Sequence, residues 1–417
     1  MSSENLKIPP IGIPEITAIN FRATQSRLRP RLNLLVPSIA AEHRFGGINT
    51  ALDFFFALTA CAKDYETRIL LTDAGLVEKL DNEFSKYQVC RMDEEADAKH
   101  QIVALNDRAF KTLSVASNDI FVATAWWTAY CAIDLIKQQS TAFSTNLPLL
   151  YLIQDFEPGF YQWSARYDAA LSTYRSSVPT MAIFNSSLLR DYFKMQGLNF
   201  LKEEFFEPRL NRRLKAYWEK GLQPDKKKKM LVYGRPSTPR NAFDAAIQAV
   251  NIWKDIYPNA GEWEIVSLGE KHADIPLGCV TVKSHGKVAL DEYARHLLNA
   301  AVGLSLMVSP HPSYPPLEMA HFGCLTVTND FANKKWAGLH ENFFSINSAT
   351  PNDIAKRLRE ACEQYEEKPG CGWRGKSHLN YYLSDNSQFN FIEKMAAYIS
   401  DAFSQNRSPD MAIRDID

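Results

Sequence analysis

Short apolar runs recur along the first half of the chain, separated by longer stretches with helical periodicity. A run that is apolar throughout is typical of a strand buried on both faces of a parallel sheet. The stretches 48–62 and 125–128 predict connecting helices, and Asn185-Ser186-Ser187 is typical of a helix cap. The predicted strands are 32–39, 68–72, 102–105, 119–124, 149–153 and 180–184. Strands that alternate with helices predict a mostly parallel, doubly wound sheet.

The same pattern begins again in the second half of the chain. Helices are predicted at 242–256 and 291–300, and a charged amphipathic helix at 351–367. The predicted strands are 230–233, 263–268, 280–283, 302–308 and 325–328. An apolar stripe at helical spacing between Phe391 and Phe403 predicts one more helix with a docking face. The fold class is therefore α/β, with two doubly wound parallel-sheet domains.

These patterns divide the chain into five segments. We expect an N-terminal arm at 1–30, an acceptor-side domain at 31–205 and a donor-binding domain at 230–387. A C-terminal helix and tail at 388–417 is expected to pack back on the first domain. Between the domains, residues 206–229 contain nine Lys/Arg and three Asp/Glu, and are predicted to be a basic linker. This linker is either a solvated connector or a contact with an anionic membrane surface.

Composition excludes several classes of protein. At 46% apolar residues the chain can bury large cores, and a net charge of −1 argues for neither nucleic acid nor an acidic partner. No apolar run approaches the roughly 18 residues that a membrane span needs. Seven dispersed cysteines without a CxxC pair fit reduced thiols, and no His/Cys cluster has zinc spacing. The N-terminus does not resemble a signal peptide, so we expect a cytoplasmic protein. Because no cluster has zinc spacing, we expect no metal site.

The most distinctive stretch is residues 309–320, with the sequence SPHPSYPPLEMA. It follows a buried strand and begins a helix, which is where open α/β sheets bind ligands. Pro315 and Pro316 suit a helix start, and free amides beyond them are expected to meet an anion. Ser313 and Tyr314 in the loop are predicted ligand contacts. Glu318, in the first helical turn, either stabilises the helix dipole or contacts the ligand.

Charged residues also follow other strands of the second domain. Arg235 and Arg240 come after the strand 230–233, and Lys287 follows the strand 280–283. Each alone is more often a surface charge. Together with Glu318 they suit a diphosphate and sugar hydroxyls, because cations offset the phosphate charge and a carboxylate accepts hydrogen bonds.

The first domain has two candidate sites after its strands. Gly46 and Gly47 lie between a strand and a helix, where glycine lets the backbone approach a ligand closely, although a plain tight turn is as consistent with the pattern. Asp155 and Glu157 are candidate catalytic residues that position or deprotonate an acceptor hydroxyl. A helix-capping role for both carboxylates remains the alternative.

Five motifs together resemble the family-4 glycosyltransferases. They are EHRFGGI (42–48), ATAWWT (123–128), QDFEP (154–158), YGRP (233–236) and the stretch 309–319. The resemblance implies the GT-B fold, two Rossmann-like domains facing across a cleft. It is closer still to bacterial rhamnosyltransferases that use dTDP-L-rhamnose to build surface glycans such as O-antigen or S-layer polysaccharide.

The resemblance also implies roles for single residues. Arg235 and Lys287 would hold the donor diphosphate, Glu318 would bind the nucleotide's sugar, and Gly46-Gly47 would approach the donor phosphates. Neither a metal ion nor a cofactor is expected. The implied partners are a nucleotide-sugar donor, a dTDP-sugar, and a glycan or lipid-linked glycan acceptor. Nucleic acid is not expected as a partner, whereas peripheral contact with the inner face of a membrane is.

The sequence departs from the family pattern at two positions. Family members usually carry a second glutamate eight positions before Glu318, where this chain has Pro310, which argues against an ordinary glucose-type donor. Arg240 stands where lysine is usual. Two alternatives stay open: a GT-B sugar-nucleotide epimerase, and a non-catalytic scaffold of a glycan-assembly complex.

Overall fold

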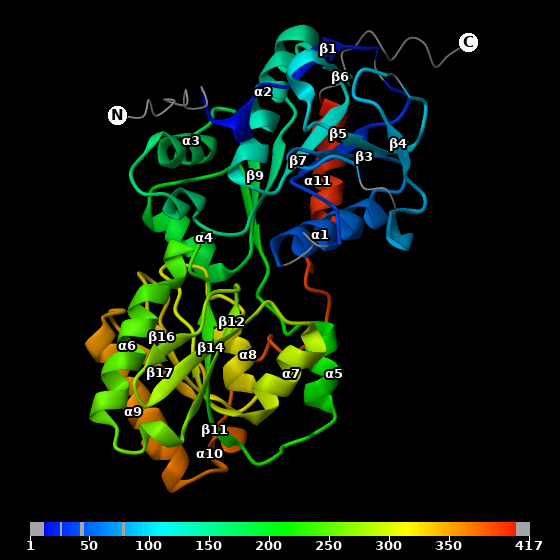
Figure 1. The fold of residues 1–417 in the computed structure, drawn as a ribbon. Helices are drawn as coiled ribbons and strands as arrows, with labels where there is room; N and C mark the ends of the chain where they lie inside the picture. The colour runs from blue at the N-terminus through cyan, green and yellow to red at the C-terminus, as the bar shows by residue number, and fades with distance from the viewer. Residues whose placement is uncertain (1–11, 26, 42–45, 77–79, 95, 406–417) are drawn as a thin grey trace, which may run out of the picture. The chain divides into compact units, whose positions relative to one another are not determined.

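The computed structural model describes residues 12–25, 27–41, 46–76, 80–94 and 96–405 (Figure 1). These residues divide into two compact units. Unit 1 contains the described residues up to Phe184, Gly197–Phe205 and those from Phe389 onward. Unit 2 contains Asn185–Gln196 and Phe206–Gln388. None of the helices in the described part of the chain is long and apolar enough to cross a membrane.

Unit 1 is built on an eight-stranded sheet in the order β10-β9-β8-β7-β2-β3-β5-β4, with every pair parallel. The central strands are buried at every residue, as their apolar runs predict. The strands are β2 (Arg31–Val36), β3 (Glu66–Leu71), β4 (Gln88–Cys90), β5 (His100–Ala104), β7 (Asp119–Ala123), β8 (Leu149–Ile153), β9 (Thr180–Phe184) and β10 (Lys202–Phe205). Its helices are α1 (Gly47–Cys61), α2 (Trp126–Phe143), α3 (Ala165–Tyr174) and α11 (Ile392–Gln405).

The first thirty residues contribute more than the predicted arm. Within them, β1 (Asn20–Ala23) pairs in parallel with β6 (Thr112–Val115) in a separate two-stranded sheet. β1 is mostly exposed, but Ile19 just before it is buried. The segment therefore lies on the surface as a paired strand.

The C-terminal helix α11 packs against α1 in unit 1, and Figure 1 shows the two helices together. Just before α11, the ring of Phe389 meets Phe54 of α1 edge-on, with the ring centroids 5.5 Å apart. Met395 and Ile399 of the apolar stripe are buried. The stripe is thus a docking face within unit 1.

Unit 2 is built on a seven-stranded sheet in the order β13-β14-β12-β11-β15-β16-β17, in which β13 alone of the paired strands runs antiparallel. The strands are β11 (Lys227–Gly234), β12 (Glu264–Gly269), β13 (Ile275–Leu277), β14 (Val280–Gly286), β15 (Ala300–Leu304), β16 (Leu325–Asn329) and β17 (Phe343–Ile346). Its helices are α4 (Ser187–Met195), α5 (Arg212–Glu219), α6 (Phe243–Ile256), α7 (Leu290–Asn299), α8 (Pro315–His321), α9 (Pro351–Glu367) and α10 (Cys371–Arg374).

Alternate residues of β11 show why unit 2 is doubly wound. Met230 and Val232 pack into one core together with residues of α6 and α9, whereas Leu231 packs into a second core with residues of α5, α7 and α8. Figure 1 shows α6 and α9 on one side of this sheet and α5, α7 and α8 on the other. Successive side chains of a strand point to opposite faces, so a strand between two helical layers must be apolar throughout.

The prediction of a linker at 206–229 is wrong. This segment belongs to unit 2, where Leu214 of α5 is fully buried and β11 already begins at Lys227. The side chain of Lys226 is buried as well, and its ammonium donates a hydrogen bond to the carbonyl oxygen of Leu297 at 2.7 Å. Burial lowers the pKa of Lys226 to about 8.

Two further lysines of the run are bound to unit 2. Lys228 forms ion pairs with Glu262 and Glu366, and Lys229 lies 3.3 Å from Glu264. These three lysines therefore bind carbonyl and carboxylate groups of their own unit, so this part of the segment is not a solvated connector.

Candidate functional site in unit 2

The predicted charged residues of unit 2 gather at one edge of its sheet. β14, β12, β11 and β15 are consecutive neighbours in the sheet and run parallel. Lys287 follows β14, Arg235 follows β11, and the stretch 309–320 follows β15. The carboxyl ends of these strands therefore bring the residues together at the edge where open α/β sheets bind ligands.

Arg235 and Lys287 are two cations close enough for the charge of Arg235 to lower the pKa of Lys287. Burial, and then the positive charge of Arg235, lower the pKa of Lys287. The stem of Arg235 lies over Gly269 at the end of β12, where an added Cβ would come within 3.1 Å of Arg235 Cγ. Arg235 also helps to lower the pKa of Glu270, after the hydrogen bonds that Glu270 accepts from Ser237. Like charges held together in this way favour the binding of an anion between them.

Arg240 is tied to the segment that leads into the stretch 309–320. It lies in the short helical turn Pro239–Asn241, and its carbonyl oxygen accepts a hydrogen bond from the Val308 amide at 2.7 Å. The adjacent Asn241 donates to the carbonyl of Leu306 at 3.2 Å. The loop after β11 and the loop after β15 are thus fastened to each other.

The loop that contains Ser313 and Tyr314 is held by local hydrogen bonds. The Ser313 amide donates to His311 Nδ1 at 3.0 Å, and the His311 amide donates to Ser309 Oγ at 3.1 Å. Ser313 has a φ of 68°, a left-handed conformation that costs free energy for a residue with a Cβ. The Tyr314 hydroxyl lies 3.5 Å from Asn185 Oδ1. The surrounding bonds therefore hold a backbone shape that the chain would not adopt by itself.

The helix α8 offers an anion fewer amides than expected. Pro315 and Pro316 occupy its first two positions and carry no N–H. The Glu318 amide donates to the carbonyl of Tyr314 at 2.9 Å. Side-chain cations are consequently the main source of positive charge at this edge.

Glu318 is buried, with 8% of its surface exposed. Its Oε2 accepts a hydrogen bond of 2.8 Å from the hydroxyl of Tyr293 on α7. Burial raises the pKa of Glu318 from 4.5 to about 7, and the bond from Tyr293 offsets part of that rise. A carboxylate kept in this environment is ready to accept hydrogen bonds from a ligand that brings hydroxyl groups.

This raised pKa makes the stability of unit 2 depend on pH. Between pH 4.5 and 7 the folded state binds more protons at Glu318 than the unfolded state, so stability falls as the pH rises through this range. At pH 8 the ionised carboxylate costs on the order of 3 kcal/mol, since each unit of pKa corresponds to about 1.36 kcal/mol. We expect Glu318→Gln to be more stable than wild type at pH 8 by up to that amount, and about equal near pH 4.5.

Urea unfolding at both pH values measures this effect. Glu363→Gln, which removes an exposed carboxylate on α9, is the control and should show no such pH-dependent gain. A Glu318→Gln variant whose stability relative to wild type is the same at both pH values would contradict the proposed burial of a charge.

Two residues that sequence reasoning missed support this edge. Tyr293 lies 25 positions before Glu318 and on a different helix. Lys334 is 1% exposed, and its ammonium donates to the carbonyl of Met307 at 2.7 Å. Neither residue stands next to a motif, so no local pattern marks them.

In unit 1, three of the motifs meet at the carboxyl ends of β8, β7 and β2, which are neighbours in the sheet. Gln154 donates to the carbonyl of Thr124 at 3.2 Å, and a Cβ on Gly47 would lie 3.0 Å from Gln154 Oε1. Gly46 has a φ of 40°. The backbone of the turn therefore favours glycine at Gly46, and the approach of both glycines to the donor phosphates stays a prediction. Residues 42–45 of the same motif lie outside the described residues.

Glu157 has the capping role that was the alternative to catalysis. It is 5% exposed, and its carboxylate accepts a hydrogen bond from the amide of Trp126, the first residue of α2. A carboxylate bound there satisfies an amide without an intrahelical partner and complements the helix dipole. Asp155 is also buried and accepts a bond of 2.8 Å from the Phe156 amide. The geometry thus favours a structural role for Glu157, and the catalytic role of Asp155 stays a prediction.

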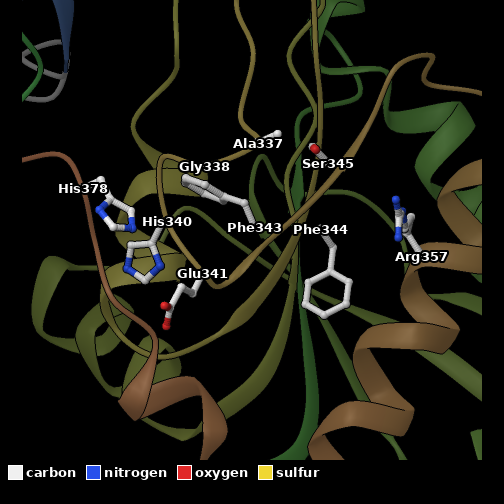
Figure 2. A pocket seen from close by; sticks show the side chains of 9 residues that line it. All are labelled: Ala337, Gly338, His340, Glu341, Phe343, Phe344, Ser345, Arg357 and His378. Carbon is white, nitrogen blue, oxygen red and sulfur yellow. The ribbon is translucent and has the colours of Figure 1, made fainter.

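A separate hollow of about 430 Å³ lies beside the edge strand β17. Figure 2 shows His340 and His378 at one end of it and Arg357 at the other. None of the predicted site residues lines this hollow. It is therefore distinct from the edge that holds Arg235, Lys287 and Glu318.

Comparisons with known proteins agree with this organisation. Residues 31–187 match the model of the WsaF N-terminal domain, and residues 228–359 match that of the WsaF C-terminal domain. The O-antigen biosynthesis protein RfbC of Myxococcus xanthus is 27% identical over 250 residues, which cover 58% of this chain and 18% of that protein. The chain thus spans less than a fifth of the length of this relative.

Solved structures with similar folds share little sequence identity with the chain. Sucrose-phosphate synthase of Thermosynechococcus elongatus has a TM-score of 0.54 at 13% identity, covering 90% of this chain and 99% of that one. WaaG, a glycosyltransferase involved in lipopolysaccharide biosynthesis, has a TM-score of 0.51 at 11% identity, covering 88% and 99%. These likenesses concern the fold, whereas the two WsaF domains together match more than half of the chain. The chain therefore belongs to the WsaF family of GT-B glycosyltransferases.

Proposed function

We propose that this protein transfers L-rhamnose from dTDP-L-rhamnose to a hydroxyl group of a bacterial surface glycan, free or lipid-linked. The observation that carries the proposal is the pair Arg235 and Lys287, which lies at the same sheet edge as the buried carboxylate of Glu318. The O-antigen biosynthesis protein that is similar over 250 residues supports a surface-glycan acceptor. Pro310, where a sugar-binding glutamate is usual in the resembling family, supports a deoxyhexose as donor sugar.

In this proposal the two cations stabilise the charge that builds up on the departing diphosphate. Electrostatic stabilisation by fixed charges is the term that usually dominates such reactions, and it needs no metal ion when cationic side chains supply the charge. Glu318 accepts a hydrogen bond from a hydroxyl of the nucleotide's sugar. The rigid loop with Ser313 and Tyr314 lines the donor site between these groups.

Nucleotide binding measured by calorimetry tests this function. We expect dTDP to bind more tightly than UDP or GDP, with equal affinity in the presence and absence of magnesium. Lys287→Ala should weaken dTDP binding, because the ammonium at the end of β14 is lost. Lys283→Ala is the matched control, since it removes an exposed lysine from the same strand.

Each other outcome overturns part of the proposal. A preference for UDP or GDP would remove the proposed donor. Turnover of the nucleotide sugar without an acceptor would favour the epimerase alternative. Absence of nucleotide binding would remove the transferase function and favour a scaffold in glycan assembly.

A further inference from the structure

Three metal-ligating side chains converge beside the end of β14. His285 lies on β14, and Glu292 and His296 lie on α7. One nitrogen of each histidine and one oxygen of the glutamate all lie within 4.8 Å of one another. Residues four positions apart on a helix share one face, so Glu292 and His296 point to the same side. The turn between β14 and α7 places His285 against that face.

The contacts within this cluster are close. The imidazole rings of His285 and His296 meet edge to face with their centroids 5.2 Å apart, and Glu292 Oε1 lies 3.9 Å from His296 Nε2. His296 is buried, Glu292 is half-buried and His285 is exposed. The cluster is therefore fixed on its inner side and open to solvent on its outer side, so an ion has a route of entry.

We propose that His285, Glu292 and His296 form a binding site for a divalent transition-metal ion of the zinc type. Two imidazole nitrogens and one carboxylate oxygen are a ligand set that zinc accepts, with water at the remaining position. Magnesium and calcium prefer sites made of oxygen ligands alone, so the two histidines select against them.

The charges around the cluster are compatible with a bound cation. The positive charge of Lys229 lowers the pKa of His296, and Lys229 is itself paired with Glu264 at 3.3 Å. The negative charges of Glu292 and Glu264 raise the pKa of His296 and so favour a positive charge at this place. Burial, together with Lys229 and His285, lowers the pKa of His296 to about 4.

No sequence motif marks this site, because one ligand lies on β14 and the other two lie on α7. Gly286 follows His285 with a φ of 70° and is packed against Lys271, and Lys287 comes next. An ion at the cluster would therefore join the loop that carries Lys287 to α7. The proposal does not depend on the glycosyl transfer proposed above, because it rests on different residues and needs no nucleotide.

The test uses the tag-free chain of 417 residues after removal of metals with a chelator. We expect calorimetry to show one equivalent of Zn²⁺ bound, no binding of Mg²⁺, and a d–d absorption spectrum of bound Co²⁺ typical of nitrogen and oxygen ligands. His285→Ala and Glu292→Gln should each weaken Zn²⁺ binding on the order of 100-fold or more, since changes outside the ligand shell alone cost about 10–100-fold. His378→Ala, which removes an exposed histidine elsewhere in unit 2, should leave the affinity unchanged.

A second readout keeps the test independent of folding defects. Zn²⁺ should raise the melting temperature of the wild type and not that of His285→Ala, whose exposed side chain can be removed without disturbing a core. Equal affinity in wild type and both variants would overturn the proposal. A sulfur-to-cobalt charge-transfer band would also overturn it, because it would place the ion on a cysteine.

Discussion

Arg235→Ala is expected to reduce glycosyl transfer by on the order of 100-fold to 1000-fold, the range measured when one preorganised donor to a developing negative charge is removed. Arg235 directly follows β11, and its stem is fixed over Gly269. Since a guanidinium presents its N–H groups in a rigid fork, it matches the oxygens of a diphosphate. Removing it also relieves the repulsion that lowers the pKa of Lys287. We therefore expect the pKa of Lys287 to rise in the variant.

Initial rates with a dTDP-sugar and a glycan acceptor, at saturating and at low donor concentration, measure this effect. The loss should appear in kcat as well as in kcat/KM, because the charge on the diphosphate grows towards the transition state. Arg212→Ala removes an exposed arginine of unit 2 on α5 and is the control for a change of net charge. Transfer at the wild-type rate by Arg235→Ala would place the diphosphate elsewhere.

The alternation of strands and helices was readable from the sequence wherever a strand is covered on both faces. β8 and β9 are buried at every residue, and their apolar runs predicted them with the bounds that the structure has. The edge strand β10 was not predicted from the sequence. β10 has the sequence KEEF and pairs on one side only, with β9, so its exposed positions tolerate charge and its pattern resembles a loop.

The position of the candidate site followed from a rule about sheets, because parallel strands present their carboxyl ends at one edge. This rule placed Arg235, Lys287 and Glu318 together without any knowledge of their contacts. The burial and the hydrogen bonds of each side chain did not follow from this rule. The burial of Glu318 and its bond from Tyr293 depend on how α7 packs against α8, which residues distant in sequence decide.

The same reason explains why the roles of charged residues do not follow from local sequence, and the catalytic role of Glu157 stays a prediction. The lysines at 226–229 resemble a solvated run, yet Lys226 fills a buried position and binds a carbonyl 71 residues away. Glu157 follows a strand as a catalytic residue would, yet it caps a helix that begins 31 residues earlier. A charged side chain shows its role only through its partner, and local sequence does not specify partners at such distances.

A buried ion cluster in unit 1 carries the second large expected effect. Asp119, at the start of β7, accepts two bonds from Arg31, at 2.7 Å and 2.6 Å, and lies 3.5 Å from the guanidinium of Arg68. All three side chains are at most 4% exposed. Burial pushes the pKa of Asp119 up, but Arg31 and Arg68 outweigh it and hold the pKa below its ordinary value. The cluster joins the starts of β2, β3 and β7.

Asp119→Ala is expected to destabilise unit 1 by about 3–5 kcal/mol, because removing one partner of a buried ion pair leaves the other charges in the core uncompensated. Thermal unfolding of the 417-residue chain measures the loss of stability, and a separate hydrogen-exchange measurement at β2 and β7 assigns it to unit 1. Asp107→Ala is the matched control: Asp107 pairs with Lys111 at 2.6 Å in the same unit, but its side chain is 58% exposed, so water replaces the lost partner and stability should hardly change. If Asp119→Ala were as stable as Asp107→Ala, the arginines would have to reach water or another carboxylate, and the buried cluster would not be what holds the starts of these three strands together.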